Sequence, residues 1–356
     1  MTKIPQLRLA SQWLVGERDT DPAGVVGHLG AVQAQDYGPA KWSLGLRTAG
    51  TTDADVERAF NDGAVLRTHI LRPTWHFVTP ADLGWMQALT AERVHKVNGS
   101  MYRKLDLDAK LLRRAHDVIG QAVGRGNYST RAEIGKALHR RRIAADGQRL
   151  GYILMHAELE ALVCSGPRRG KQHTYALVEE RAPESQVLDR DEALARLAVR
   201  YFTGHGPASE YDLAWWSGLT VMDARAAIAL AAPGLDTYAV DDRTLWLAPD
   251  LKPVSQRKPT VFVVSIYDEY TIAYKDRSDI GDPEDGERMA AMGNALTSVI
   301  VIDGKLAGTW KRTLTRTSVD IACEPFGALT APELRELDAA VERYGTFLDL
   351  AARRVG

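Results

Sequence analysis

The sequence has 356 residues, of which 45% are hydrophobic and 26% are charged, and its formal net charge is −1. This composition is typical of globular proteins, and the length predicts two to three domains, or more if each is small. The near-zero net charge excludes a protein that binds nucleic acid through its overall charge, so only a local basic cluster could do so. The two cysteines have neither the spacing of a metal site nor that of a disulfide framework.

The sequence predicts no export signal and no membrane segment. The N-terminal residues lack an apolar signal core, and the most apolar runs, at residues 226–232 and 261–266, are too short to cross a bilayer. We therefore expect a cytoplasmic protein that does not contact a membrane. The residue pattern also leads us to expect no cofactor and no metal ion.

Residues 1–100 predict helices followed by a pair of strands. Proline at position 22 suits the first turn of a helix, and Thr52 and Gly63 are typical start and stop residues of another. The predicted elements are helices at residues 7–16, from residue 22 onward, at 40–46 (a helix or an extended piece) and at 53–61, and two strands within residues 65–78. Short helices followed by a β-hairpin are typical of a winged helix.

The same order recurs twice along the chain. Thr130 and Glu133 have the spacing of a capping box, and Gly218 ends a later helix. The predicted helices lie at residues 111–123, 131–138 and 151–163 in the second copy and at residues 191–202, 210–216 and 220–231 in the third, with strand pairs at residues 164–177 and 236–247. Copies spaced by about 65 to 85 residues indicate an internal structural repeat.

The residues after Pro253 predict a different kind of structure. Strand patterns dominate, and Asp303 with Gly304 forms a typical hairpin turn. Strands are expected within residues 260–274, 298–311 and 321–325, a polar loop leading into a short helix at 281–292, and a closing helix at 331–354.

We therefore predict an α+β fold with three tandem winged-helix units, a small β-barrel-like domain and a C-terminal helix. The predicted boundaries are residues 1–100, 101–186 and 187–252 for the three winged helices, and residues 253–356 for the β-barrel-like domain with its helix.

Gln33 and Gln35 are candidate catalytic residues because a single small residue separates them. Positions i and i+2 share a face in an extended backbone and diverge in a helix. Gly38 and Pro39 follow, which favours a loop or a short extended segment. Amides cannot titrate, but two of them can hold and aim a water molecule, which suits hydrolysis with a good leaving group. On spacing alone, the pair is also compatible with surface or loop-capping amides.

Two other candidate groups lie nearby or in the second unit. Asp36 is an alternative residue for activating a water molecule. Residues 131–173 contain nine Lys and Arg against four acidic residues, a net of 9 − 4 = +5, as expected for phosphate contacts. Arg168, Arg169 and Lys171 in the second strand pair are the candidates for DNA contacts, although a solvated polar turn has the same composition.

Two functions without the glutamine pair also fit parts of the pattern: a transcriptional regulator and a glycoside hydrolase. Winged helices occur more often in transcriptional regulators than in enzymes. Such regulators usually dimerise, whereas this chain has three units and no long heptad helix, so we expect a monomer. Asp268 and Glu269 are adjacent carboxylates of the kind used by glycoside hydrolases. We expect them instead to bond to the backbone and to basic residues such as Arg277, and we expect Trp215 and Trp216 to lie in the core.

The sequence resembles the bacterial AlkZ-type DNA glycosylases over essentially its whole length. Each shared motif is short, and their order makes the resemblance specific. The motifs are Leu-Gly-Ala-Val-Gln-Ala-Gln-Asp at residues 29–36, Arg-Pro-Thr-Trp-His-Phe at 72–77, Ser-Gly-Pro-Arg-Arg-Gly-Lys at 165–171, Gly-Pro-Ala-Ser at 206–209 with Asp212 and Trp-Ser-Gly-Leu at 216–219, Tyr-Asp-Glu-Tyr at 267–270, and Val-Ile-Asp-Gly-Lys-Leu-Ala-Gly-Thr-Trp at 301–310. Pro73 and Trp75 depart from the glycine and leucine of the family.

The resemblance implies a C-shaped array of winged helices closed by a β-barrel domain, with double-stranded DNA in its concave side. It implies a monofunctional glycosylase that excises N-alkylated purines, including bulky N7 adducts and, in some members, interstrand crosslinks, in DNA repair or self-resistance. The family's catalytic Gln–apolar–Gln motif falls on Gln33 and Gln35. Arg72 and His76 in the first strand pair are candidate DNA contacts, and His76 is equally compatible with a hydrogen-bonded structural histidine on a strand.

Overall fold

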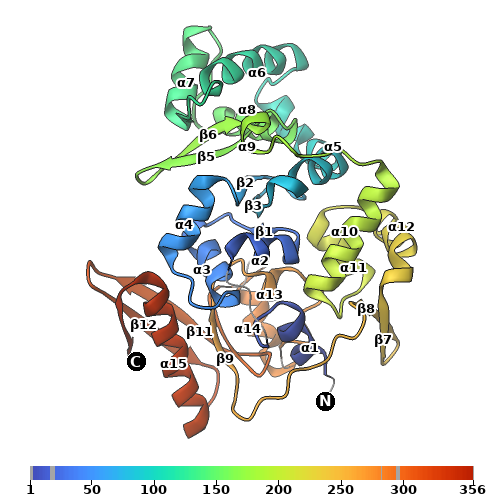
Figure 1. Cartoon of the computed structure of the whole chain (residues 1–356), viewed down its shortest axis with the longest axis vertical. Helices are drawn as coiled ribbons and strands as arrows, with labels where there is room; N and C mark the ends of the chain where they lie inside the picture. Colours follow the sequence, from blue (N-terminus) through green and yellow to red (C-terminus); the bar gives the residue numbers. More distant parts are fainter. Residues whose placement is uncertain (1–2, 17–20, 282, 294–296, 356) are drawn as a thin grey trace.

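The structure is a computed structural model that describes residues 3–16, 21–281, 283–293 and 297–355. Figure 1 shows the N-terminal helices and their sheet in the middle of the molecule, between the green helices and strands at one end and the C-terminal sheet at the other. Within the described residues, no helix is both long enough and apolar enough to cross a membrane.

The first unit contains helices and a strand pair close to the predicted positions. A short additional strand, β1, lies between its second and third helices and joins the same sheet. Its strands have the order β1-β3-β2, so β1 pairs with the second strand of the hairpin. The elements are α1 (Ile4–Ser11), α2 (Pro22–Leu29), β1 (Val32–Gln33), α3 (Tyr37–Arg47), α4 (Asp53–Asp62), β2 (Leu66–His69) and β3 (Trp75–Val78).

Local sequence explains where these helices begin and end. The Thr52 hydroxyl accepts a hydrogen bond from the Asp55 N–H, and the Asp55 carboxylate accepts one from the Thr52 N–H, which starts α4 with a capping box. Gly63 ends α4 in the left-handed conformation, with φ of 89°. Gly38 and Pro39 do not form the expected loop, because they lie in the first turn of α3, where proline removes no helical hydrogen bond.

A long helix that the sequence analysis did not predict leads from the first unit to the second. This helix, α5 (Pro80–Lys104), spans the expected boundary between residues 100 and 101. The second unit has α6 (Ala109–Val123), β4 (Ser129–Thr130), α7 (Arg131–Arg140), α8 (Gly147–Leu159), β5 (Val163–Arg169), β6 (Gln172–Leu177) and α9 (Val178–Arg181). Its sheet order, β4-β6-β5, repeats that of the first unit.

The third unit has the same order of elements in a reduced form. It contains α10 (Arg190–His205), α11 (Glu210–Ser217), α12 (Val221–Ala231), η1 (Ala232–Gly234), β7 (Asp236–Val240) and β8 (Arg243–Leu247). Ala208, between α10 and α11, forms an isolated bridge to Trp246 on β8. This bridge occupies the position that β1 and β4 occupy in the other two sheets.

The C-terminal part forms a five-stranded sheet in the order β13-β12-β11-β10-β9. Its elements are β9 (Val261–Val264), α13 (Glu269–Ile272), η2 (Pro283–Asp285), α14 (Gly286–Ala291), β10 (Val299–Ile302), β11 (Lys305–Leu314), β12 (Ser318–Pro325), α15 (Ala331–Leu348) and β13 (Ala351–Val355). Two expectations are wrong here. Strand β9 is followed by helix α13 instead of more strand, and the closing helix ends at Leu348 before β13 pairs in parallel with β12.

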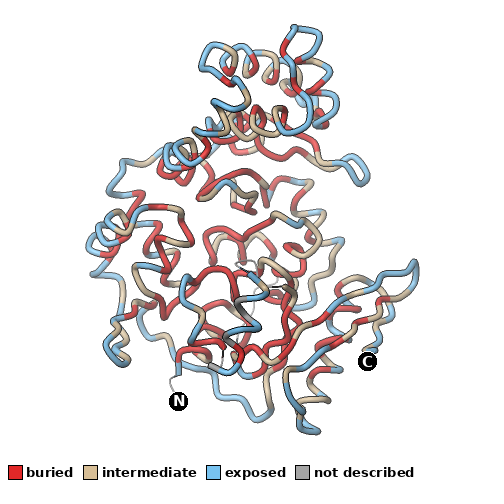
Figure 2. Tube along the Cα trace, turned by 180° about the vertical axis from the view of Figure 1, so that it is seen from behind, coloured by how far each residue is buried: buried red, intermediate tan, exposed pale blue. Residues whose placement is uncertain are grey.

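The first unit shares its apolar core with its neighbours. One cluster of buried side chains combines α2, α3 and α4 with β9–β12 and α15, and a second joins β2, β3 and α5 to α10–α12. In the first cluster, the Trp42 indole N–H donates to the Val263 carbonyl at 2.7 Å. The second unit has a separate core. Strand β1 is buried, and Figure 2 shows buried residues in red through the middle of the molecule.

Candidate active site

Strand β1 carries the first glutamine of the Gln-Ala-Gln motif. Gly30 ends α2 with φ of 81°, a conformation that favours glycine, and turns the chain into β1. In the pairing of β1 with β3, Gln33 lies opposite His76. The Ala34 N–H then donates to the Trp75 carbonyl at 2.7 Å. The backbone therefore stays paired with β3 as far as Ala34, and the chain bends at Gln35, one residue after the extended segment ends.

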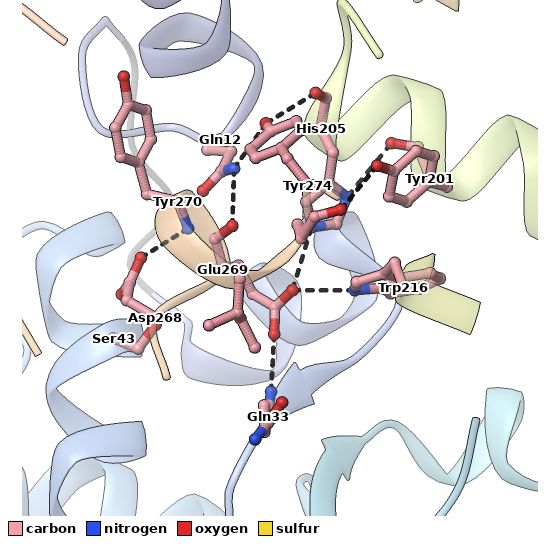
Figure 3. Close-up of polar contacts among 12 residues, drawn as sticks. Gln12, Gln33, Ser43, Tyr201, His205, Trp216, Asp268, Glu269, Tyr270 and Tyr274 are labelled. Carbon is pink, nitrogen blue, oxygen red and sulfur yellow. Dashed lines mark hydrogen bonds and ion pairs between the residues drawn. The ribbon is translucent and has the colours of Figure 1, made fainter. Parts of the chain in front are cut away.

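Gln33 contacts two charged residues from distant parts of the chain. The Arg72 guanidinium donates to Gln33 Oε1 at 2.9 Å, and the Gln33 backbone N–H donates to Glu269 Oε1 at 2.7 Å. Figure 3 shows the Glu269 side chain directed at Gln33 from the short helix α13. Gln33 is only 7% exposed. Its backbone and its carboxamide are thus both held in place.

Gln35 contacts the same segment of the first strand pair. Its side-chain oxygen accepts a hydrogen bond from the Trp75 N–H at 3.4 Å, and its backbone carbonyl accepts one from Arg67 at 3.3 Å. The Arg67 guanidinium also lies 4.3 Å from the centre of the Trp75 ring. Residues 72–75 therefore contact both glutamines.

Asp36 lies at the edge of this arrangement. It is the N-cap residue of α3, but its side chain makes no capping hydrogen bond, and it is exposed. The two glutamines are buried or half-buried beside it. The structure thus groups Gln33 and Gln35 with Arg72 and leaves Asp36 outside the group.

His76 is fully buried, which agrees with a structural histidine and not with a residue that faces DNA. Its Nδ1 lies 3.0 Å from the Thr74 carbonyl, so Nδ1 carries the proton and donates it. Burial, together with the nearby Arg72 charge, lowers the pKa of His76 well below its ordinary value, so the ring is neutral. A direct contact between His76 and DNA has no support in the structure, because none of the residue is exposed.

Glu269 lies in a buried polar environment formed by the third unit. Its Oε2 accepts a hydrogen bond from the Trp216 indole at 2.9 Å and lies 3.4 Å from His205 Nε2. Figure 3 shows both side chains approaching Glu269, and none of the three residues is exposed. Sequence reasoning gave Glu269 no part in the glutamine site. Its only signal was a carboxylate within the aromatic motif at residues 267–270.

Asp268 belongs to a different network from its neighbour Glu269. Its carboxylate pairs with Arg47 at 2.8 Å, and neither side chain is exposed. Burial raises the pKa of Asp268, but the charge and hydrogen bonds of Arg47 outweigh this and hold it below its ordinary value. The two carboxylates have separate partners, which contradicts a paired-acid site. Arg47 also takes the place of the expected partner Arg277.

Arg72 and Glu269 place opposite charges on the two sides of Gln33. Arg72 is half-buried; burial lowers the pKa of its guanidinium, and the charge of Glu269 acts in the opposite direction. The Arg72 Nε is buried and makes no hydrogen bond within the described residues. The Gln33 amide, held by Arg72, and the nearby Gln35 amide can orient a water molecule, but amides are poor proton acceptors.

The basic residues of the second strand pair have different environments. Arg168 is half-buried and pairs with Glu57 of the first unit at 3.3 Å. Arg169 pairs with Glu133 at 2.7 Å but stays exposed, and Lys171, in the turn between β5 and β6, is exposed as well. Arg168 therefore joins two units, whereas Arg169 and Lys171 lie at the surface.

Comparisons with known proteins identify the family. The model of the DNA glycosylase AlkZ-like family matches residues 26–347. The chain belongs to the AlkZ-like DNA glycosylase family. It is 22% identical over 318 residues to the interstrand DNA cross-link repair glycosylase of Streptomyces sahachiroi, a match that covers 85% of each protein. The solved structure of the S. sahachiroi DNA glycosylase AlkZ matches with a TM-score of 0.80 and 19% identity over 99% of both chains, which shows that the fold is shared.

Membership of the AlkZ-like DNA glycosylase family confirms the resemblance found in the sequence. The chain is an enzyme that hydrolyses N-glycosyl bonds, and a regulator without catalysis is not favoured. The shared mixed α+β fold is also as predicted.

Proposed function

We propose that this glycosylase is monofunctional and removes N-alkylated purines, chiefly those alkylated at N7, from double-stranded DNA. Bulky adducts and interstrand crosslinks belong to the proposal, because the S. sahachiroi relative is named for cross-link repair. The observation that carries the proposal is the pair Gln33 and Gln35, with Gln33 held by Arg72 and Glu269. This arrangement suits a reaction that needs a positioned water molecule more than a strong base.

Alkylation at N7 makes the purine a good leaving group because it places a positive charge on the ring. When the bond between N9 and C1′ breaks, its electron pair neutralises that charge and the base leaves as a neutral molecule. C1′ then develops oxocarbenium character. A water molecule adds to C1′ and loses a proton to solvent, which leaves an abasic deoxyribose in an uncut strand.

Gln33 and Gln35 are the proposed catalytic residues that hold this water. Arg72 uses one lone pair of the Gln33 side-chain oxygen, and the second can accept a hydrogen bond from water. Orienting a nucleophile against the reacting carbon can contribute several kcal/mol to catalysis, about 7–11 in well-aligned intramolecular reactions. An unmodified purine, which is a poor leaving group, would gain little from two neutral amides.

Glu269 is the proposed electrostatic partner of the site. Its carboxylate is not exposed and lies one hydrogen bond from Gln33. A fixed negative charge in a site of low dielectric interacts strongly with the positive charge that develops at C1′. Glu269 also partly offsets the charge of Arg72, which would otherwise oppose the oxocarbenium ion.

The three repeated units are the proposed DNA-binding scaffold. Each has helices followed by a strand pair, with the same sheet order in the first two, and we interpret them as winged helices arranged around duplex DNA. Arg169 and Lys171 are the proposed phosphate contacts. Three units in one chain suit a monomer acting in the cytoplasm, either in general repair or in self-resistance.

Excision from a duplex with a single N7-methylguanine tests the proposal. We expect strand breaks at the lesion only after heat or alkali, because a monofunctional enzyme leaves the abasic strand intact, and none in the unmodified duplex. Gln33→Ala and Gln35→Ala should each lose most excision and still bind DNA. Full single-turnover excision by both variants would contradict the assigned roles.

A further inference from the structure

We propose that His95, His156 and Glu160 form a binding site for a divalent transition metal of the zinc class. One ligand atom from each residue lies within 4.8 Å of the other two. The three residues lie on α5 and at the end of α8, apart from the glutamine site. The proposal does not depend on the reaction assigned to that site.

The helices direct the three side chains toward one point. His156 and Glu160 are four residues apart at the end of α8, so they share a face of that helix. His95 faces them from α5, with its Nε2 3.0 Å from Glu160 Oε1 and its ring 4.6 Å from that of His156. Two imidazoles and a carboxylate are a ligand set suited to zinc, and two nitrogens are poorly suited to magnesium.

The second nitrogen of each imidazole already has a partner. His95 Nδ1 lies 2.8 Å from the Tyr102 hydroxyl, and His156 Nδ1 lies 3.1 Å from His116 Nε2. Metal-bound histidines commonly donate their other N–H to such a group, which fixes the ring. This leaves Nε2 of both rings as the ligand atoms. The Nε2 of His95 is buried and faces the Glu160 carboxylate at 3.0 Å.

The spacing of the ligand atoms is close to that of a bound zinc ion. Zinc–ligand bonds of 2.0–2.1 Å in a tetrahedron place the ligand atoms roughly 3.3 Å apart. One pair is at 3.0 Å, and all three atoms lie within 4.8 Å. The remaining adjustment concerns the distances to His156, and Glu160, whose side chain is 50% exposed, can change rotamer to follow it. Three protein ligands leave the fourth position to water.

A metal ion bound here would stabilise the interface between the first and second units. Helix α5 leaves the first unit, and α8 carries Glu158 between the two ligands of that helix. Glu158 pairs with His69 and accepts a hydrogen bond from the Trp75 indole at 3.3 Å. Trp75 in turn donates its backbone N–H to Gln35. Occupancy would thus fix the helix that supports the first strand pair.

A calorimetric titration of the full-length, chelator-treated protein with Zn²⁺ tests the site. We expect one equivalent to bind, and Co²⁺ in its place to give the intense visible absorption of a tetrahedral complex. His95→Ala and His156→Ala should each lose this equivalent. His139→Ala is the matched control, because His139 is an exposed histidine of the same unit that pairs with Asp146 instead. It should bind as the wild type does.

A graded variant separates ligands from supporting residues. His116→Ala removes only the partner of His156 and should weaken binding by roughly 10- to 100-fold without abolishing it. Zn²⁺ should raise the Tm of the wild type and of His139→Ala, but not that of His95→Ala. His95→Gln, which retains a hydrogen-bonding side chain, gives the same test should the alanine variant fail to fold by circular dichroism. No saturable binding, or equal binding by the wild type and the two ligand variants, would overturn the proposal.

Discussion

The Glu269 carboxylate accepts a hydrogen bond of 2.7 Å from the backbone N–H of Gln33, although 236 residues separate them in sequence. The four-residue helix α13 presents this carboxylate, and Asp268 caps the helix by accepting a hydrogen bond from the Tyr270 N–H. Trp216 binds the other carboxylate oxygen. The position of the Gln33 backbone therefore depends on the C-terminal part and the third unit as well as on the first.

Replacing Glu269 by Gln should lower single-turnover excision about 100-fold, because misplacement of a reacting group by about 1 Å has an effect of that size. Both carboxylate oxygens accept hydrogen bonds, from Gln33 and from Trp216. An amide has one acceptor oxygen, so one buried donor would face an N–H₂ group, at a cost of about 1–3 kcal/mol in stability. Excision and urea unfolding, measured on the same preparation, check both expectations.

Asp268→Asn is the matched control for this variant. It leaves the buried Arg47 charge without a carboxylate, which should cost about 3–5 kcal/mol in stability. Asn retains an acceptor oxygen for the Tyr270 N–H at the start of α13, and Asp268 makes no hydrogen bond to Gln33, so excision by the folded fraction should stay within a few-fold of wild type. An equal loss of excision in both variants, corrected for the folded fraction, would mean that Glu269 has no specific role.

Arg72→Met should lower the excision rate roughly 10- to 100-fold, the range that corresponds to about 1.5–3 kcal/mol for a hydrogen bond to a charged group. The reason is that the Gln33 oxygen loses the donor at 2.9 Å that orients its amide. Arg72→Lys retains the charge but not the planar geometry, so it should restore the rate only in part. Weaker DNA binding with an unchanged rate for bound DNA would instead make Arg72 a phosphate contact.

Local sequence rules predicted most helices of the repeated units. They did not predict helix α13, which carries Glu269 next to Gln33. Thr52 and Gly63 delimit α4 through contacts within the helix and its ends, so the sequence reveals them. Helix α13 is different, because it has four residues and is supported by the long-range pair of Asp268 with Arg47. Such support has no local signature, which is why the segment was predicted as a strand.

Long-range contacts also explain why the sequence did not predict the C-terminal strand or the candidate metal site. The periodicity of α15 continued past its true end, where Asp349 adopts a left-handed conformation with φ of 54°. Strand β13 exists because it pairs in parallel with β12, a contact that depends on the fold. His95 and His156 lie on different helices, far apart in the sequence, so no short motif reveals that they meet. The glutamine pair was a candidate because of its spacing, and the resemblance to the AlkZ-type glycosylases singled it out.

The free energy of unfolding should fall as the pH decreases from about 6.5 toward 5. Burial is the main cause that lowers the pKa of His28 and of His173 to about 4. Burial also lowers the pKa of His76 well below its ordinary value. In this window the unfolded chain binds protons on these rings and the folded chain does not. Each ring therefore contributes a loss of up to about 1.4 kcal/mol per pH unit, and carboxyl groups titrate at lower pH.

Urea unfolding at several pH values checks this slope, and His28→Phe isolates one ring. The Phe ring can keep the stacking of His28 on Trp13, whose ring centres lie 3.7 Å apart, but it binds no proton. The variant should show a slope smaller by about one proton, whatever its stability at pH 7. A slope that matches the wild type, or stability that stays constant from pH 7 to 5, would show that these rings are protonated in the folded protein.

Arg169→Gln and Lys171→Gln should weaken DNA binding and reduce its dependence on salt. Each phosphate contact releases counterions, so each substitution should lower the slope of log K against log salt concentration by roughly 0.9. Both side chains are exposed at the turn between β5 and β6. Fluorescence anisotropy with an undamaged duplex measures the slope, and excision of saturated substrate should not change.

Arg168→Gln is the control in the same strand. Arg168 is half-buried against Glu57, and its guanidinium lies 4.8 Å from the centre of the Tyr37 ring. Its loss should lower stability and leave the salt slope near that of the wild type, because its side chain is largely buried between the first two units and, unlike Arg169, is little exposed to solvent. A reduced slope in Arg168→Gln alone, with none in the double variant Arg169→Gln/Lys171→Gln, would move the DNA-binding surface from the turn to the interface of the first two units.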